Sequence, residues 1–208
     1  MNRTRVFAIE GIDGCGKTSV IAELSKRLSN QQIPHEVISE TSNVGLGNDI
    51  FNFMRTNYHG LDATSRLLLM LAMRNQVENT LMRDAIKHGK LVIMDRYDLS
   101  TLVYQHDSYL CDPLVKQLAP PWKVATFILD VSAMTVMRRL HLRNELKDIF
   151  DSAPETVINT RRQLFLSKAM QLNRYVRVLD AERSIDDIVS DLYTEILDKY
   201  GYPKPDAN

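Results

Sequence analysis

One eight-residue stretch near the start of the chain has the residue types and spacing of a phosphate-binding loop. Residues 11–18 match the pattern G-x-x-x-x-G-K-[ST] at every fixed position. In such a loop the glycines let backbone amides turn towards a phosphate, the lysine reaches the terminal phosphates and the threonine hydroxyl can ligate magnesium. The stretch therefore predicts a nucleoside triphosphate site. Its residues are Gly11, Ile12, Asp13, Gly14, Cys15, Gly16, Lys17 and Thr18.

The aspartate inside this loop narrows the class of reaction. Unaided, the Asp13 carboxylate would repel the phosphates of the bound nucleotide. A second group, either magnesium-bridged or proton-bearing, is therefore expected beside it. This favours a kinase whose acceptor is itself phosphorylated. The alternative is that Asp13 only stabilises the loop, through a hydrogen bond to the backbone.

A second polar group, Asp95-Arg96-Tyr97, directly follows an apolar run at 91–94. Ligands of open α/β sheets bind beyond the carboxyl ends of the strands, so these three residues are expected to face the nucleotide site. There Asp95 could hold magnesium through water, and Arg96 could grip a substrate phosphate with two hydrogen bonds. A purely structural Asp–Arg pair is the alternative.

The elements that would position these residues follow from the hydrophobic pattern. Short apolar runs lie at 6–9, 36–38, 91–94, 125–129 and 175–179, and segments of helical length separate them. Strands that alternate with helices indicate an α/β fold with a parallel sheet covered on both faces. With the phosphate loop after the first run, we expect a three-layer, five-stranded fold of the P-loop NTPase type.

Several helix boundaries can also be predicted. Residues 62–88 should form one helical segment that Gly89 ends, while Ser132 and Ser184 are expected to cap helices further along the chain. Within the first of these segments, residues 67–73 are seven consecutive apolar residues and would cover every side of a helix. Such a helix is expected to be buried all round, either in the core or in a subunit interface.

Composition excludes several classes of protein. The 208 residues, 44% of them apolar, are enough for one domain (1–208) with a substantial core, and only the tail 201–208 looks loose. The 26 basic and 26 acidic residues balance, so no global field favours nucleic acid or an anionic membrane. Cys15 and Cys111 are expected to be free thiols in a reducing compartment. Because no apolar run approaches the roughly 20 residues that span a bilayer, we expect a cytoplasmic protein.

Taken together, these stretches resemble the thymidylate kinases, a family of P-loop nucleoside monophosphate kinases. The matching stretches are the first strand and phosphate loop (7–18), the substrate helix (67–76), the signature after the third strand (95–105), the basic lid (138–146) and the stretch near the adenine (178–181). The resemblance extends over most of residues 6–197 and implies magnesium-dependent phosphoryl transfer from ATP to dTMP. It also implies a helical lid at about 138–150 and, together with the apolar helix, a homodimer.

The resemblance assigns roles to individual residues. The implied catalytic residues are Asp13, Lys17, Arg96 and Arg143. ATP would be held by the phosphate loop with Arg139 and Asp180, and Mg²⁺ by Thr18 and Asp95. The acceptor would be bound by Glu40, Met70, Arg74, Gln76, Arg96, Tyr97, Thr101 and Tyr104, with Arg74 at the place of the base-binding arginine.

The lid is expected to supply the arginine that stabilises the transition state. In the family this arginine lies either in the phosphate loop or in the lid, and here the loop has Gly14 and Cys15. Arg143 best matches the lid arginine, with Arg138 and Arg139 as further candidates. Removing such a charge can cost a factor of about a thousand in rate. The alternative is that these arginines form the solvated face of a helix.

The acceptor base is left open by two departures from the family pattern. Ser39 and Thr41 replace an arginine and a proline around Glu40, and Met70 stands where a phenylalanine usually packs on thymine. The same chemistry on dUMP or a 5-substituted dUMP is therefore the closest alternative. A deoxynucleoside kinase is disfavoured, because a neutral acceptor needs no phosphate grip from Arg96. A GTP-binding switch is disfavoured because the chain has no Asn-Lys-x-Asp sequence for guanine.

Overall fold

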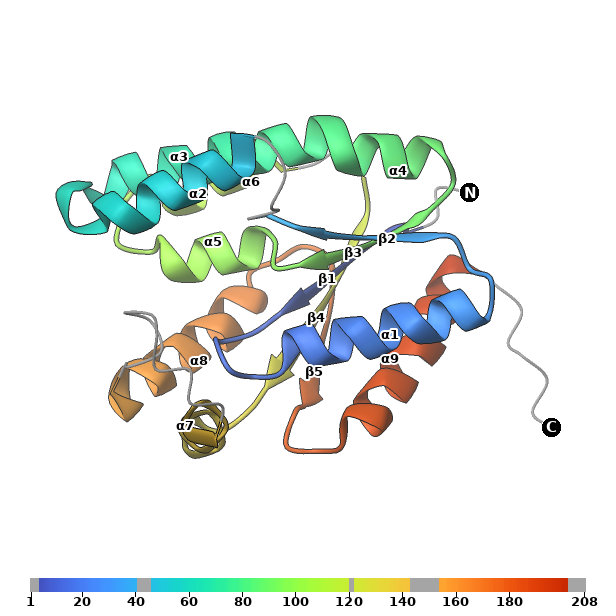
Figure 1. The fold of residues 1–208 in the computed structure, drawn as a ribbon. Helices are drawn as coiled ribbons and strands as arrows, with labels where there is room; N and C mark the ends of the chain where they lie inside the picture. Colours follow the sequence, from blue (N-terminus) through green and yellow to red (C-terminus); the bar gives the residue numbers. More distant parts are fainter. Residues whose placement is uncertain (1–3, 41–45, 120–121, 143–153, 202–208) are drawn as a thin grey trace.

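A computed structural model describes residues 4–40, 46–119, 122–142 and 154–201, and shows strands alternating with helices (Figure 1). The strands are β1 (Val6–Glu10), β2 (His35–Ser39), β3 (Leu91–Asp95), β4 (Val124–Asp130) and β5 (Tyr175–Asp180). The helices are α1 (Lys17–Asn30), α2 (Leu46–Asn57), α3 (Ala63–Val77), α4 (Arg83–Lys87), α5 (Asp98–Tyr104), α6 (Cys111–Gln117), α7 (Ala133–Leu142), α8 (Glu155–Ala169) and α9 (Ile185–Tyr200). A 3-10 turn spans Tyr58–Gly60, and a π-helical segment spans Glu78–Met82.

The strands form one parallel sheet in the order β2-β3-β1-β4-β5, which confirms the predicted five-stranded α/β architecture. The central strand β1 pairs with β3 and β4, so that Phe7 lies between Ile93 and Ala125. Every residue of β1 is buried. A strand covered on both faces must be apolar on both, which is why a continuous apolar run marked it in the sequence.

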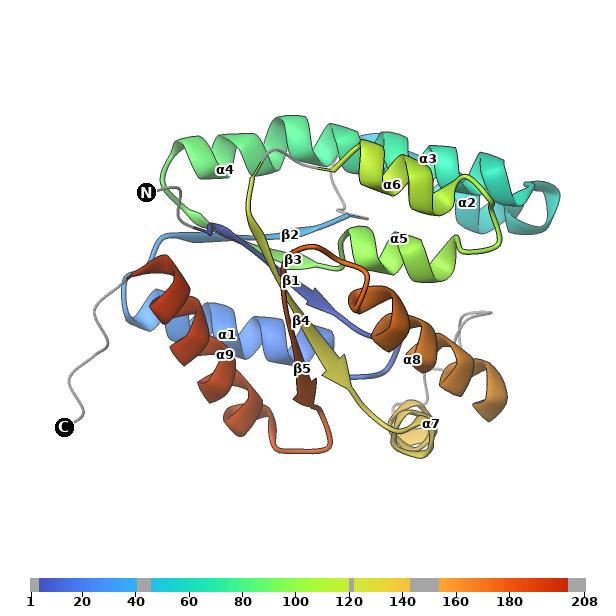
Figure 2. The same cartoon turned by 180° about the vertical axis from the view of Figure 1, so that it is seen from behind.

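Helices cover both faces of the sheet. Phe7 of β1 belongs to the same core cluster as Leu24 of α1 and Leu192 of α9, whereas Ala8 packs in a second cluster with Met82 and Ala85. Figure 1 shows α1 and α9 along one side of the sheet and α3 and α4 along the other. Seen from behind in Figure 2, α7 and α8 lie beside the end of the sheet to which β4 points.

The segment predicted as one helix over 62–88 contains a π-helical turn. Asp62 caps α3 by accepting a hydrogen bond from the backbone N–H of Ser65, and the π segment joins α3 to α4 without a break. Gly89, with φ of 76°, follows the last turn as predicted. π-Helical turns are rare and often occur at functional sites.

The prediction that residues 67–73 are buried all round within the core was wrong. Leu67, Leu71 and Met73 are buried, but the side chain of Leu68 is 51% exposed. Within one chain the helix therefore has a buried face and an apolar exposed face. The other alternative that the sequence offered, a subunit interface, is compatible with this exposed face.

The predicted helix caps are confirmed. The hydroxyls of Ser132 and Ser184 accept hydrogen bonds, both of 3.2 Å, from backbone amides in the first turns of α7 and α9. Cys15 and Cys111 are free and buried. Among the helices described by the structure, none is long and apolar enough to cross a membrane.

Candidate active site

A polar cavity of about 200 Å³ lies where the phosphate loop meets the end of β3. It is lined by Asp13, Gly14, Gly16, Lys17, Thr18, Ser19, Asp95 and Arg96. The structure therefore brings together the two polar groups that the sequence singled out, at the carboxyl ends of adjacent strands. Both predicted magnesium residues, Thr18 and Asp95, contribute to this one cavity.

The phosphate loop needs glycine at defined positions. Gly11 has φ of 141°, and a Cβ atom there would lie 2.7 Å from the carbonyl oxygen of Leu129. Gly16, with φ of 104°, leads directly into α1. Lys17 is buried, and its Nζ donates hydrogen bonds to the carbonyl oxygens of Gly11 (3.0 Å) and Ile12 (2.9 Å). Its amino group is thus held against the loop that it is expected to assist.

Asp13 is bound by two side chains from beyond the phosphate loop. Arg96 donates one hydrogen bond to its carboxylate, and the hydroxyl of Tyr104 donates another, 2.8 Å long. Burial acts to raise the pKa of Asp13, but the charges of Arg96 and Lys17 outweigh it, with smaller contributions from Tyr104 and Arg161, so that the pKa lies below its usual value. Asp13 is therefore ionised at neutral pH and part of a network.

Arg96 adopts a backbone conformation that is rare for a residue with a side chain. Its φ is +68°, in the left-handed region. Its Nη1 donates to the carbonyl oxygen of Gly11 at 3.0 Å and to the hydroxyl of Ser100 at 3.1 Å. These contacts hold the guanidinium group over the phosphate loop. Strained residues of this kind cluster at functional sites, where the surrounding structure maintains them.

Glu10, which the sequence reasoning did not identify, binds the residues that follow Arg96 and so helps to hold this strained turn. Its carboxylate is fully buried and accepts hydrogen bonds from the backbone N–H of Tyr97 (2.8 Å), the backbone N–H of Ser100 (3.2 Å) and the Ser100 hydroxyl (2.6 Å). Burial raises the pKa of Glu10 to about 7, against the opposing effects of Ser100 and Arg96. The sequence signal that could have identified Glu10 is a charged residue at the end of an apolar strand.

Arg74 lies at the centre of a second buried network. Its Nε donates to Glu40, and its Nη2 donates to the hydroxyl of Thr101 and, at 3.4 Å, to the carbonyl oxygen of Tyr97. Arg74 and Glu40 are 5% and 2% exposed. The guanidinium group that was expected to contact the acceptor base is thus fixed by the residue after β2 and by two residues at the start of α5 and just before it. Met70, one turn earlier on α3, is half-buried.

Two other residues of the predicted acceptor site differ in burial. The side chain of Tyr97 is completely buried, and its hydroxyl donates to Glu78 at the start of the π-helical segment. It therefore anchors the loop against α3 and exposes no surface to a ligand. Gln76 is exposed, whereas Arg74 on the same helix is buried.

Arg139 of α7 connects the phosphate loop to the chain after β5 through two hydrogen bonds. Its Nη1 donates to the carbonyl oxygen of Cys15 at 3.0 Å, and its Nη2 to that of Ala181 at 2.8 Å. Asp180, next to Ala181, is exposed. These contacts bring together two stretches that were predicted to flank ATP. Arg143 and most of the predicted lid lie outside the described residues.

The residues present fit a magnesium ion that arrives with a nucleotide. No group of three or more His, Cys, Asp or Glu side chains within the described ranges could hold a metal ion alone. Among the oxygen-bearing side chains that line the cavity are the hydroxyl of Thr18 and the carboxylate of Asp95, the two predicted magnesium ligands. Mg²⁺ usually takes few protein ligands and completes its coordination with water and substrate phosphates.

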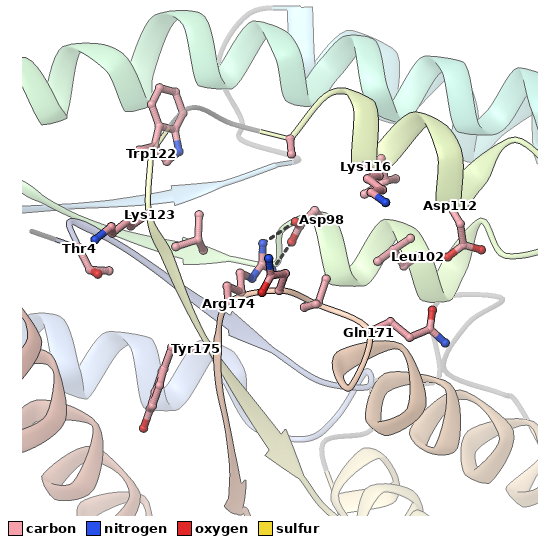
Figure 3. A pocket seen from close by; sticks show the side chains of 15 residues that line it. Thr4, Asp98, Leu102, Asp112, Lys116, Trp122, Lys123, Gln171, Arg174 and Tyr175 are labelled. Carbon is pink, nitrogen blue, oxygen red and sulfur yellow. Dashed lines mark hydrogen bonds and ion pairs between the residues drawn. The ribbon is translucent and has the colours of Figure 1, made fainter. Parts of the chain in front are cut away.

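A larger cavity, of about 860 Å³, contains none of the predicted site residues (Figure 3). It lies between α5, α6 and the starts of β4 and β5. In Figure 3, Arg174 and Asp98 pair across it, with Arg174 Nη1 2.6 Å from Asp98 Oδ2. The smaller polar cavity is the candidate active site, because the phosphate loop, Asp95 and Arg96 line it.

The fold and this cavity define a P-loop phosphotransferase. The sequence profile of the thymidylate kinase family matches residues 9–192, so the chain belongs to that family, whose members phosphorylate dTMP to dTDP. It is 32% identical to the thymidylate kinase of Chlamydia trachomatis, over 86% of this chain and 94% of the relative. It is 31% identical to that of Syntrophotalea carbinolica (88% and 90%) and 29% identical to that of Fervidobacterium nodosum (87% and 92%). The kinase expected from the sequence is confirmed.

Proposed function

We propose that the γ-phosphoryl group of ATP passes to dTMP inside the polar cavity, with Lys17, Thr18 and Asp95 on the donor side and Asp13 and Arg96 on the acceptor side. The observation that carries the proposal is that one cavity contains both sets of residues. In-line transfer requires donor and acceptor phosphates to lie next to each other, and its catalysis consists mostly of positioning and charge neutralisation.

On the donor side, the loop amides and the amino group of Lys17 bind the phosphates of ATP, while Arg139 and Asp180 flank the adenine. Thr18, and Asp95 through water, would hold magnesium, which would supply neutralisation of the charge on the donor phosphates. Lys17 already lies against the carbonyl oxygens of Gly11 and Ile12. It therefore needs only to exchange these partners for phosphate oxygens.

On the acceptor side, Arg96 binds the phosphate of dTMP and Asp13 orients Arg96. The acceptor is a phosphate monoester, whose second pKa is about 6, so its oxygen is already an anionic nucleophile at neutral pH. No general base is needed. This agrees with the depressed pKa of Asp13, which makes that carboxylate a permanent hydrogen-bond acceptor for Arg96 and Tyr104 rather than a proton carrier.

Residues of α3 and α5 bind the pyrimidine base and the sugar of the acceptor. Arg74, oriented by Glu40 and Thr101, donates to the O4 atom of the base, and Met70 packs against the ring. Tyr104 lies beneath the sugar and crowds a ribose 2′-hydroxyl. Because a thioether packs less rigidly than an aromatic ring, discrimination at the 5-position rests on cavity size, where one methyl group is worth about 1 to 3 kcal/mol.

Two further features belong to this proposal. Arg143 closes with the lid over the transferring phosphoryl group, where its charge is needed most. The exposed apolar face of α3, marked by Leu68, pairs with a second copy of the chain to form a homodimer in the cytoplasm.

A panel of deoxynucleoside monophosphates tests the proposal directly. With ATP and Mg²⁺, dTMP should be the preferred acceptor, dUMP and 5-substituted dUMP should react measurably, and thymidine should not react. The same panel with GTP as donor tests the preference for ATP. A protein that prefers dGMP or dAMP to every pyrimidine would contradict the assignment of Arg74 and Met70 to the base.

A further inference from the structure

The cavity of about 860 Å³ shown in Figure 3 is separate from the candidate active site. None of its lining residues lines the polar cavity beside the phosphate loop. Val124 and Tyr175, the first residues of β4 and β5, border it, whereas the phosphate loop follows the last residue of β1. Pockets of about 300 to 1,000 Å³ are the usual sites for small molecules in proteins. The larger cavity therefore has the size of a second ligand site.

Much of the wall of this cavity is apolar. The aliphatic side chains that line it come from α5, α6, β4 and the segment before β5, and they are Leu102, Val115, Val124 and Leu172. The indole ring of Trp122 lies at one side of the cavity in Figure 3. A ring system placed among these side chains would be removed from water, which is favourable. The walls therefore favour a ligand with an apolar ring system.

The charged side chains around the cavity leave an excess of positive charge. Two carboxylates line it, and each is paired with a cation. The pairs are Arg174 with Asp98 and Lys168 with Asp112. Lys116 and Lys123 also line the cavity, and the side chains of both are without an ion pair in the part of the chain that the structure describes. An anionic ligand would therefore be attracted to the cavity.

The polar part of the cavity is held in place before any ligand binds. Arg174 donates hydrogen bonds from Nη1 and Nη2 to the carboxylate of Asp98, and from Nε to the hydroxyl of Thr126 at 2.9 Å. Thr126 is completely buried, and the side chain of Arg174 is 15% exposed. Because these groups are fixed by one another, little ordering is left to oppose the binding of a ligand.

We infer that this cavity binds a small organic anion with an apolar ring system. The ring lies among the aliphatic side chains and the indole of Trp122, and the negative charge is attracted by Lys116 and Lys123. In Figure 3 these two lysines lie on either side of the Arg174–Asp98 pair. The inference does not depend on the proposed function, because the two cavities have no lining residue in common.

Two fluorescent dyes with the same ring system test the inference on the full-length protein. Anilinonaphthalene sulfonate is anionic, whereas phenylnaphthylamine lacks the sulfonate group and is neutral. Both dyes should bind saturably. The double substitution Lys116→Gln and Lys123→Gln should weaken binding of the anionic dye at least about fivefold and leave binding of the neutral dye within about twofold, because exposed ion pairs each contribute modestly. Both lysines are exposed, so the variant should fold normally.

The position of the bound dye can be checked at Trp122, the only tryptophan of the chain. Its side chain gives a single indole N–H signal in NMR spectra. This signal should shift as the anionic dye is added, with the same dissociation constant as the fluorescence titration. Lys26→Gln with Lys87→Gln is the matched control, since it removes two charges from exposed lysines of α1 and α4 that do not line the cavity. It should leave both affinities unchanged.

Three results would overturn the inference. The first is the absence of saturable dye binding, and the second is saturable binding that leaves the indole signal of Trp122 in place, because the dye would then lie elsewhere. The third is a double substitution at Lys116 and Lys123 that weakens both dyes equally or neither of them. The experiment uses no nucleotide, so its outcome is independent of whether the protein phosphorylates dTMP.

Discussion

Replacing Glu10 with glutamine should make the protein more stable at alkaline pH than the wild type. Glutamine has the shape of a protonated glutamate, and its carbonyl oxygen can accept the same hydrogen bonds from the backbone N–H groups of Tyr97 and Ser100. It carries no charge that must be held without water. The substitution therefore imitates the protonated side chain, which burial favours.

The size of the effect follows from the shift in pKa. The pKa of Glu10 is raised from 4.5 to about 7, and each unit corresponds to about 1.4 kcal/mol. Between these values the folded protein binds more protons than the unfolded chain, so the free energy of unfolding falls as pH rises. The ionised carboxylate thus costs about 3 kcal/mol well above pH 7, and most of that cost develops between pH 5 and pH 8.

Urea unfolding of both proteins at several pH values between 5 and 8 measures this difference. The free energy of unfolding of Glu10→Gln minus that of wild type should grow with pH by about 2 to 3 kcal/mol over this range. Glu10→Ala is the contrasting variant and should be less stable than wild type at every pH, because it leaves buried donors of Tyr97 and Ser100 unpaired. A difference between Glu10→Gln and wild type that stays flat, or falls with pH, would refute the reasoning.

Four further substitutions test other parts of the site and the assembly. Arg143→Ala should lower kcat at least about a hundredfold with little change in ATP binding, and a near-normal kcat would move the role to another arginine. Arg96→Ala should abolish transfer while an ATP analogue, in a direct binding assay, binds within a few-fold of normal; equal loss of donor binding would contradict its place on the acceptor side. Arg74→Ala should cost about 3 to 5 kcal/mol in urea unfolding, because Glu40 is left buried and unpaired, and a stable variant would mean that water reaches Glu40. Leu68→Arg should give a monomer in sedimentation, where wild type at micromolar concentration should be a dimer; a monomeric wild type would exclude that interface.

The central strands β1, β3 and β4 could be predicted because burial on both faces leaves a signal in consecutive residues. Each short apolar run became a strand, including 36–38 within β2. The buried face of α3 was harder to predict, because seven consecutive apolar residues contain no information about which side of the helix meets the sheet. The π-helical turn gave no local signal either. It coincides with a contact between Glu78 and Tyr97, which lie 19 residues apart in the chain.

In the candidate site, too, features contained in consecutive residues could be predicted, and contacts between distant residues could not. The phosphate loop was predictable because its chemistry is contained in eight consecutive residues. The role of Glu10 was not, because it binds Ser100, which lies 90 residues further along the chain. Tyr97 was assigned to the acceptor by its neighbours in the sequence, yet its side chain points into the core. Adjacent residues of a turn can point in different directions: Arg96 lines the cavity, whereas Tyr97 is buried in the core.

In the proposed acceptor side, the positively charged arginine side chains are paired with carboxylates, so the pairs carry no net charge. Arg74 and Arg96 are each paired with a carboxylate from another part of the chain, respectively Glu40 and Asp13. Each pair holds a guanidinium group in one orientation before any substrate arrives, so little reorganisation remains for the reaction itself. Neutral pairs alone attract no dianion. Binding of a dianionic acceptor therefore requires positive charge from outside these two pairs.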